Sequence, residues 1–150
     1  MVKILVIGSG AREHAIIKSL NKSKKEKEIY CLASNNNPGI SGICKEMKII
    51  DINNAQLIKD YTIKRNIKIA IIGPEDPLAH GVADSLWEAK IGVVGPKKNL
   101  AQIETSKSFT RNLLREYKIP GCPKFKTFTN MKGVEDFLSL LGENYVVKYD

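Results

Sequence analysis

Cysteine is scarce in this sequence, and the cysteines that occur are far apart. Cys31, Cys44 and Cys122 are odd in number and form no Cys-x-x-Cys pair. A disulfide framework needs an even set, and a structural zinc site needs paired ligands. Both are therefore excluded. We expect buried or free thiols, and we assign no residue of this chain to a metal.

Long hydrophobic runs are also missing. The apolar stretches have the length of a strand, and the run that follows Met1-Val2-Lys3 is broken at Gly8. A signal peptide or a membrane-spanning helix needs a longer run. We therefore expect no membrane partner and a cytoplasmic location.

Arginine is rare, although the net charge is +8. The lysines are scattered, and their densest run, residues 22–28, is interrupted by glutamates. Aromatic residues do not interleave with the basic ones, as a stacking platform for single strands would require. The composition, 43% apolar and 27% charged, is that of an ordinary globular protein. We expect no nucleic-acid partner.

Over the first hundred residues, short apolar runs alternate with stretches of helical periodicity. The predicted strands are residues 3–7, 28–33, 47–50, 68–72 and 92–94, and the predicted helices are residues 12–21, 54–65 and 78–89. Continuous apolar strands suit a parallel sheet that is covered on both faces. Right-handed crossovers then give an α/β fold with a doubly wound, mostly parallel sheet.

The pattern changes after Gly95-Pro96. We expect a helix that starts at Asn99 or Glu104 and ends before Ile119-Pro120-Gly121, a candidate hinge. A strand over 124–128, a helix over 132–141 and a strand over 145–148 should follow. The predicted organisation is one domain at 1–103, a helical connection and hinge at 104–121, and the incomplete beginning of a second domain at 122–150.

The first predicted strand runs into the turn Gly8-Ser9-Gly10 and then directly into a helix. Glycines let the backbone approach an anion, and the first amides of the helix point toward it. Arg12 and His14 lie on the same helix; we expect a packing role for His14. Further glycine-bearing segments follow the other strands at 37–42, 73–78 and 95–96. In a parallel sheet they meet at one edge and predict a pocket there.

The end of the second strand limits the class of ligand that this pocket can bind. A dinucleotide-binding sheet carries an acidic residue at the end of that strand, for the ribose hydroxyls. Here the strand ends in Leu32-Ala33-Ser34-Asn35, and the third fingerprint glycine is also missing. A small phosphate ester fits better than a nicotinamide dinucleotide.

Four segments together resemble phosphoribosylamine–glycine ligases of the ATP-grasp class: residues 8–15, 73–84, 94–96 and 106–109. The resemblance implies a Rossmann-like domain followed by the start of an ATP-grasp domain. It also implies ATP-dependent ligation of glycine to 5-phosphoribosylamine in purine biosynthesis. The products are glycinamide ribonucleotide, ADP and phosphate, and the glycine is activated as glycyl phosphate. Ala11 departs from the family, which usually has a third glycine there.

The resemblance also assigns binding residues. Gly8, Ser9 and Gly10 would receive the phosphate, Arg12 would be a charge partner, and Glu75 would hydrogen-bond ribose hydroxyls. Lys107 and Lys148 match the lysines that hold ATP phosphates. Asp76 and His80 are expected to be structural, and no catalytic residue is assigned.

ATP with magnesium or manganese would serve the full-length enzyme, whose metal ligands, adenine site and glycine site are expected after Asp150. We therefore expect the 150-residue chain alone to be inactive. Its oligomeric state is left open, with a monomer as one option.

Three other interpretations stay open at this level. A carboxylase or formyl-transferring ligase of the same architecture is disfavoured by the segment 73–84. An NAD-dependent oxidoreductase domain rests on the glycine turn alone. A non-enzymatic nucleotide-binding module would suit a chain that ends at Asp150.

Overall fold

The structure is a computed structural model that describes residues 1–150. Its sheet has five parallel strands in the order β3-β2-β1-β4-β5. The strands are β1 (Val2–Ile7), β2 (Lys27–Ala33), β3 (Glu46–Ile49), β4 (Ile69–Ile72) and β5 (Gly92–Val94). The predicted parallel α/β sheet is confirmed, and each of the five strands predicted over the first hundred residues agrees with the observed one to within one residue at either end.

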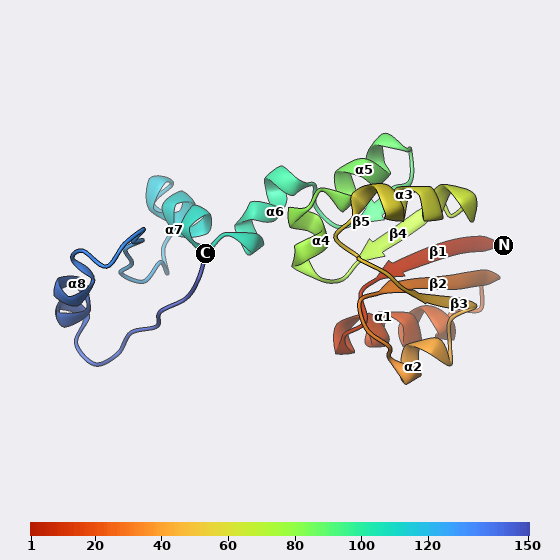
Figure 1. Ribbon diagram of the computed structural model, residues 1–150, viewed down its shortest axis with the longest axis horizontal. Coiled ribbons are helices and arrows are strands. Elements are labelled where there is room, and N and C mark those ends of the chain that lie inside the picture. The colour runs from red at the N-terminus through yellow and green to blue at the C-terminus, as the bar shows by residue number, and fades with distance from the viewer. The chain divides into compact units, whose positions relative to one another are not determined.

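The chain also forms eight helices, which are labelled in Figure 1. They are α1 (Ala11–Lys22), α2 (Pro38–Ser41), α3 (Ala55–Lys64), α4 (Glu75–Ala79), α5 (Val82–Glu88), α6 (Lys98–Thr105), α7 (Lys107–Glu116) and α8 (Val134–Leu141). None of them combines the length and the hydropathy that a membrane span requires.

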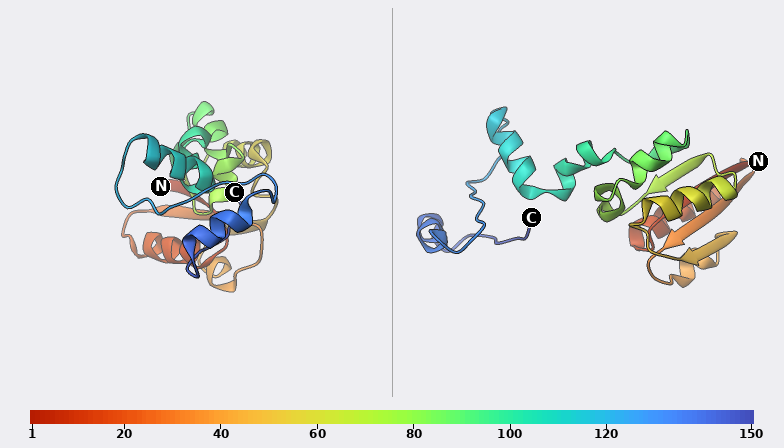
Figure 2. Two further views of the ribbon diagram at one scale, coloured as in Figure 1. Left: turned by 90° about the vertical axis from the view of Figure 1, so that its left-hand side faces the viewer. Right: turned by 45° about the horizontal axis from the view of Figure 1, so that its top comes forward.

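Helices cover both faces of the sheet, with α1 and α2 on one face and α3, α4 and α5 on the other (Figures 1 and 2). The alternation of side chains along β1 explains this arrangement, because successive residues point to opposite faces. Leu5 and Ile7 belong to the core cluster that contains Ile58 of α3, whereas Val6 belongs to the cluster that contains Ile17 of α1. Each face of the sheet thus has its own buried core.

The helix prediction needs three corrections. The helix predicted over 78–89 is two helices, α4 and α5, because Gly81 adopts a left-handed conformation with φ of 77°. The short helix α2 was not predicted; the side chain of Asn37 caps it by accepting hydrogen bonds from the amides of Gly39 and Ile40. The sequence stretch from Asn99 likewise forms two helices, with Ser106 as the N-cap of α7.

The chain divides into two compact units, Met1–Ala101 and Gln102–Asp150. The second unit contains α7 and α8, and none of its residues is fully buried. The strands predicted over 124–128 and 145–148 are wrong, since neither segment is in a strand. A strand needs a neighbour to receive its backbone hydrogen bonds, and these segments have none within the 150 residues.

Candidate functional site

The loops that follow β1, β2, β4 and β5 lie at the same edge of the sheet, because the strands are all parallel (Figure 1). These loops contain the predicted glycine-bearing segments. The carboxyl edge of an open parallel sheet is where such folds bind ligands. We therefore take this edge as the candidate site.

The turn between β1 and α1 is tightly hydrogen-bonded within the protein. Gly8, at a φ of 117°, donates its amide to the carbonyl of Leu32 at 2.8 Å. Gly10 donates its amide to Oε2 of Glu13 at 2.6 Å. In this conformation, two of the three amides predicted to hold a phosphate already donate hydrogen bonds within the protein. The donors left for an anion are those of Ser9 and of the first helical turn, Ala11 and Arg12, which a helix cannot pair internally.

Glu13 is the residue of this site that sequence reasoning missed. It is only 4% exposed, although it lies in the first turn of α1. A Cβ atom added at Gly8, Gly10 or Gly73 would lie within 3 Å of its side chain. These glycines therefore make room for an internal carboxylate. A sequence signal did exist, since a glutamate at the third helical position is typical of an N-terminal capping box.

Arg12 and Glu75 meet at the rim of the edge. A guanidinium nitrogen of Arg12, Nη2, lies 3.5 Å from Oε2 of Glu75, and Nε lies 3.8 Å from Oε1 of Glu13. The side chains of Arg12 and Glu75 are 61% and 48% exposed. The structure thus brings together the predicted residues Gly8, Ser9, Gly10, Arg12 and Glu75. Both rim side chains remain accessible to a ligand.

The end of β2 is joined to the same turn by neutral polar groups. The side-chain amide of Asn37 donates to the carbonyl of Ser9 at 2.9 Å, and the hydroxyls of Ser9 and Ser34 are 3.5 Å apart. No carboxylate follows this strand at residues 34–37. The donor set therefore lacks the acid that a dinucleotide ribose usually requires.

The two histidines have structural surroundings, as we expected. The ring of His14 fills the space beside Gly39, where a Cβ atom would lie 2.5 Å from Cε1. His80 ends α4, and its Nδ1 lies 2.8 Å from the carbonyl oxygen of Asp76.

The three cysteines are free thiols. Burial raises the pKa of Cys31 to about 12 and that of Cys44 to about 11. Cys31 donates its thiol hydrogen to the carbonyl of Gly8 at 3.3 Å. The Cys31 thiol therefore supports the glycine turn and is not a nucleophile.

Lys107 and Lys148 are both exposed and belong to the second unit. Lys107 is the first residue of α7, next to Ser106 and Ser108. The carboxylate of Asp150 accepts hydrogen bonds from the hydroxyl of Ser106 and from the amide of Ser108, the latter at 2.9 Å. The hydroxyl of Ser108 also donates to it, and these bonds lower the pKa of Asp150. The start of α7 thus accommodates an anion. Lys148 lies in no strand, because residues 142–150 are all exposed and the strand predicted over 145–148 is not formed.

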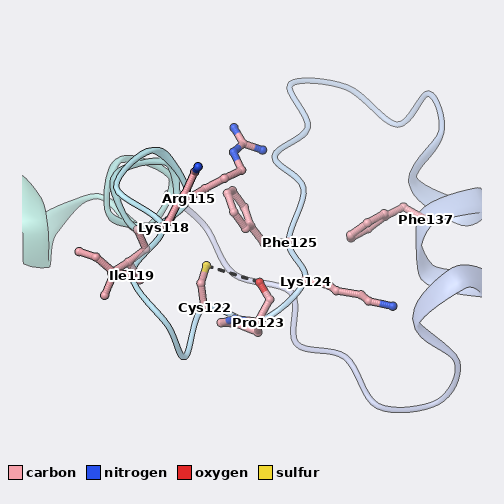
Figure 3. A pocket seen from close by; sticks show the side chains of 9 residues that line it. Arg115, Lys118, Ile119, Cys122, Pro123, Lys124, Phe125 and Phe137 are labelled. Carbon is pink, nitrogen blue, oxygen red and sulfur yellow. Dashed lines mark hydrogen bonds between the residues drawn. The ribbon is translucent and has the colours of Figure 1, made fainter.

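The second unit also contains an open cavity of about 500 Å³ (Figure 3). Phe137 of α8 faces it, and Arg115 stacks on Phe125 with its Cζ 5.1 Å from the ring centroid. The remaining lining residues are Leu114, Lys118, Ile119, Cys122, Pro123 and Lys124. This lining contains no carboxylate and no imidazole.

Residues 2–104 match the family described as phosphoribosylglycinamide synthetase, N domain. This chain belongs to that family. The matched residues include the whole sheet and every residue of the candidate site at its edge. The phosphoribosylglycinamide synthetase N domain is thus the part of the chain that carries the glycine turn, Arg12 and Glu75.

Relatives of this family extend the match. The chain is 46% identical over 142 residues to a phosphoribosylamine–glycine ligase of Methanosarcina barkeri, covering 95% of this chain and 33% of the relative. The chain spans about a third of the length of the curated relatives that it matches.

Two solved structures share the fold. N5-carboxyaminoimidazole ribonucleotide synthetase from Thermotoga maritima has a TM-score of 0.67 at 17% identity, covering 95% of this chain and 37% of that one. The synthetase from Staphylococcus aureus, complexed with ADP, has a TM-score of 0.64 at 13% identity, covering 94% and 36%. At these identities the likeness concerns the fold alone.

Proposed function

We propose that this chain is the amino-terminal part of an ATP-dependent ligase that joins glycine to 5-phosphoribosylamine in purine biosynthesis. The products would be glycinamide ribonucleotide, ADP and phosphate. The observation that carries this proposal is the family match over residues 2–104, which contains the complete carboxyl edge of the sheet. The name of the Methanosarcina barkeri relative supports it.

The role of this edge would be to bind phosphoribosylamine. The phosphate would lie at the Gly8-Ser9-Gly10 turn and accept hydrogen bonds from the amides of Ser9, Ala11 and Arg12, where the helix dipole favours an anion. The Arg12 guanidinium would add a charge-assisted contact. Glu75, half exposed beside it, would accept hydrogen bonds from ribose hydroxyls.

ATP would be held in part by the second unit. ATP supplies the phosphoryl group that activates the glycine carboxylate. The ADP bound to the S. aureus structure of similar fold supports nucleotide use. Lys107 and Lys148 are the proposed phosphate contacts, and the anion already accepted at the start of α7 fits that role. Magnesium would accompany ATP in the complete ligase. The 150 residues alone are proposed to release no phosphate from ATP in the presence of glycine.

An amide NMR titration of the 150-residue chain tests the substrate site. Glycinamide ribonucleotide should give saturable shifts at residues 8–12 and around Glu75, and NAD should give none. Shifts with NAD alone would favour an oxidoreductase domain. An absence of chemical-shift changes with both compounds would contradict the proposal that this chain carries the phosphosugar site.

Two neighbouring carboxylates provide a matched pair for the same titration. Glu75→Gln should weaken the binding of glycinamide ribonucleotide about tenfold, because the charged hydrogen-bond acceptor of the ribose hydroxyls is lost. Asp76→Asn removes the same charge one residue away and should leave the affinity within about twofold. Equal effects of the two variants would show that general electrostatics, not a contact of Glu75, favours the ligand.

A further inference from the structure

Glu13 is the only charged side chain that is buried in the structure. It lies in the first turn of α1, and its side chain turns back toward the N-terminus of the helix, as helical side chains do. There its Oε2 accepts the amide of Gly10 at 2.6 Å. A negative charge in the first helical turn is favourable, and this bond satisfies an amide that the helix leaves unpaired.

The same side chain touches two segments that are far apart in the sequence. A Cβ atom at Gly8 would lie 2.8 Å from its Cγ, and a Cβ atom at Gly73 would lie 2.1 Å from its Oε1. Gly8 begins the turn after β1, and Gly73 begins the turn after β4. Glu13 therefore fills the space between the two turns.

Oε1 of Glu13 has no hydrogen-bond partner, although it is buried. The hydrogen of the Gly73 α-carbon that lies in the Cβ direction points at it, and Nε of Arg12 lies 3.8 Å away. A Cα–H group gives only a weak hydrogen bond. The charge of Glu13 is thus compensated mainly by Arg12 and by the start of α1, and Arg12 in turn reaches Glu75.

We propose that Glu13 is a positioning residue for the phosphosugar site. It sets the spacing of the turns after β1 and β4, and it orients Arg12 so that the guanidinium meets Glu75. Through these contacts it would hold the first-turn amides and the Glu75 carboxylate where a ligand engages both. The ligand part of this inference rests on the proposed function, whereas the spacing of the turns does not.

A double-mutant cycle tests the spacing without any ligand. Gly73→Ala should raise the unfolding equilibrium constant about tenfold or more, because its Cβ collides with Oε1. In the Glu13→Ala background, where the carboxylate is absent, Gly73→Ala should raise the unfolding equilibrium constant much less. Additive effects would overturn the inference, since the two sites would then be independent.

Glu13→Gln keeps the shape of the side chain, and it is the variant to test if Glu13→Ala fails to fold. In the 150-residue chain, its loss of charge should move the Gly10 amide proton upfield and should shift the amides around Gly73 and Glu75. Glu28→Gln, at the opposite edge of the sheet, should leave these signals unchanged. An unchanged Gly10 amide in Glu13→Gln would contradict the role assigned to the carboxylate.

Affinity for glycinamide ribonucleotide then separates positioning from simple stability. Glu13→Gln should bind about five- to tenfold more weakly, with its unfolding midpoint close to that of the unaltered chain. The effect should become smaller in a Glu75→Gln background, because part of it acts through Arg12 and Glu75. Full additivity with Glu75→Gln would overturn the positioning role. Failure of the unaltered chain to bind would contradict the proposed function, and the ligand-free cycle would still decide whether Glu13 sets the turns.

Discussion

At the scale of single residues, the glycines of the candidate site make room for internal side chains. Gly73 is adjacent to Glu13, and Gly39 is adjacent to the ring of His14. Sequence reasoning placed these glycines correctly at the edge of the sheet and explained them by ligand approach. Which side chain folds back against a glycine depends on tertiary packing, and spacing along the chain does not reveal it.

Helix α2 offers a paired test of this interpretation at Gly39 and Gly42. Gly39→Ala should lower the free energy of unfolding by about 1–3 kcal/mol, because the new Cβ would lie 2.5 Å from the His14 ring. Gly42→Ala should change it by less than about 1 kcal/mol, since its nearest neighbour is at 3.4 Å and its φ of −71° suits alanine. Urea denaturation of both variants checks this. Equal losses of unfolding free energy would mean that helix propensity, and not the contact with His14, determines the effect of these substitutions.

At the scale of elements, the break between α4 and α5 makes Gly81 a test of backbone conformation alone. Its Cβ direction is open, but its φ is 77°. Gly81→Ala should cost about 1–2 kcal/mol of unfolding free energy, because alanine is strained in the left-handed region. Gly81→Asn should cost less, because asparagine tolerates that region. Thermal denaturation compares the two, and a more harmful asparagine would contradict the conformational explanation.

Strands β2 and β3 carry a second element-scale prediction at the amino edge of the sheet. The pKa of Glu28 lies below its ordinary value of 4.5, because Lys45 and the hydroxyl of Tyr30 donate hydrogen bonds to its carboxylate; Lys3 adds a nearby charge. Folding therefore favours the ionised form. This contribution is complete above the unfolded-state pKa and is lost as the pH falls through the lower pKa of the folded state.

Denaturation of Glu28→Gln at pH 7 and at pH 3.5 measures that contribution. The unaltered chain should lose more stability between these pH values than Glu28→Gln does, since the variant has no carboxylate to protonate there. Glu26→Gln is the control, because Glu26 is exposed and its side chain forms no ion pair. Its pH dependence should follow that of the unaltered chain. An identical slope in Glu28→Gln would show that this cluster contributes nothing.

The elements that sequence reasoning found are those whose pattern is local. The strand at 69–72 is a continuous apolar run, and Asn54 caps α3 by accepting from the amide of Leu57 at 3.0 Å. The incorrect strands at 124–128 and 145–148 have suitable residues but no neighbouring strand to pair with. Pairing is a property of the sheet and not of the segment, which is why local propensity was insufficient there.

At the scale of the whole molecule, the buried core lies entirely in the first unit. Each fully buried residue falls within Leu5–Ala101, and none occurs among residues 102–150. The helices of the second unit have 10 and 8 residues. Isolated helices of fewer than about 12–15 residues are marginal in water, so their stability depends on packing. We therefore expect the two units to differ sharply in local stability.

Hydrogen exchange and truncation test this difference together. In the 150-residue chain, amides of β1, β2 and β4 should exchange slowest, and those of α7 and α8 should exchange faster by orders of magnitude, because opening them exposes no buried core.

A chain that ends at Thr105 keeps α6 and the buried Ala101. Its free energy of unfolding should match that of the 150-residue chain to within about 1 kcal/mol, because surface segments contribute little to global stability. Ending the chain at Ile91 removes β5 and Ala101 and should lower the free energy of unfolding well beyond that margin, since β5 pairs with β4 in the sheet. If truncation at Thr105 were as harmful as truncation at Ile91, the folding unit would have to include residues 106–150, and the glycine turn with Glu13 would owe part of its geometry to them.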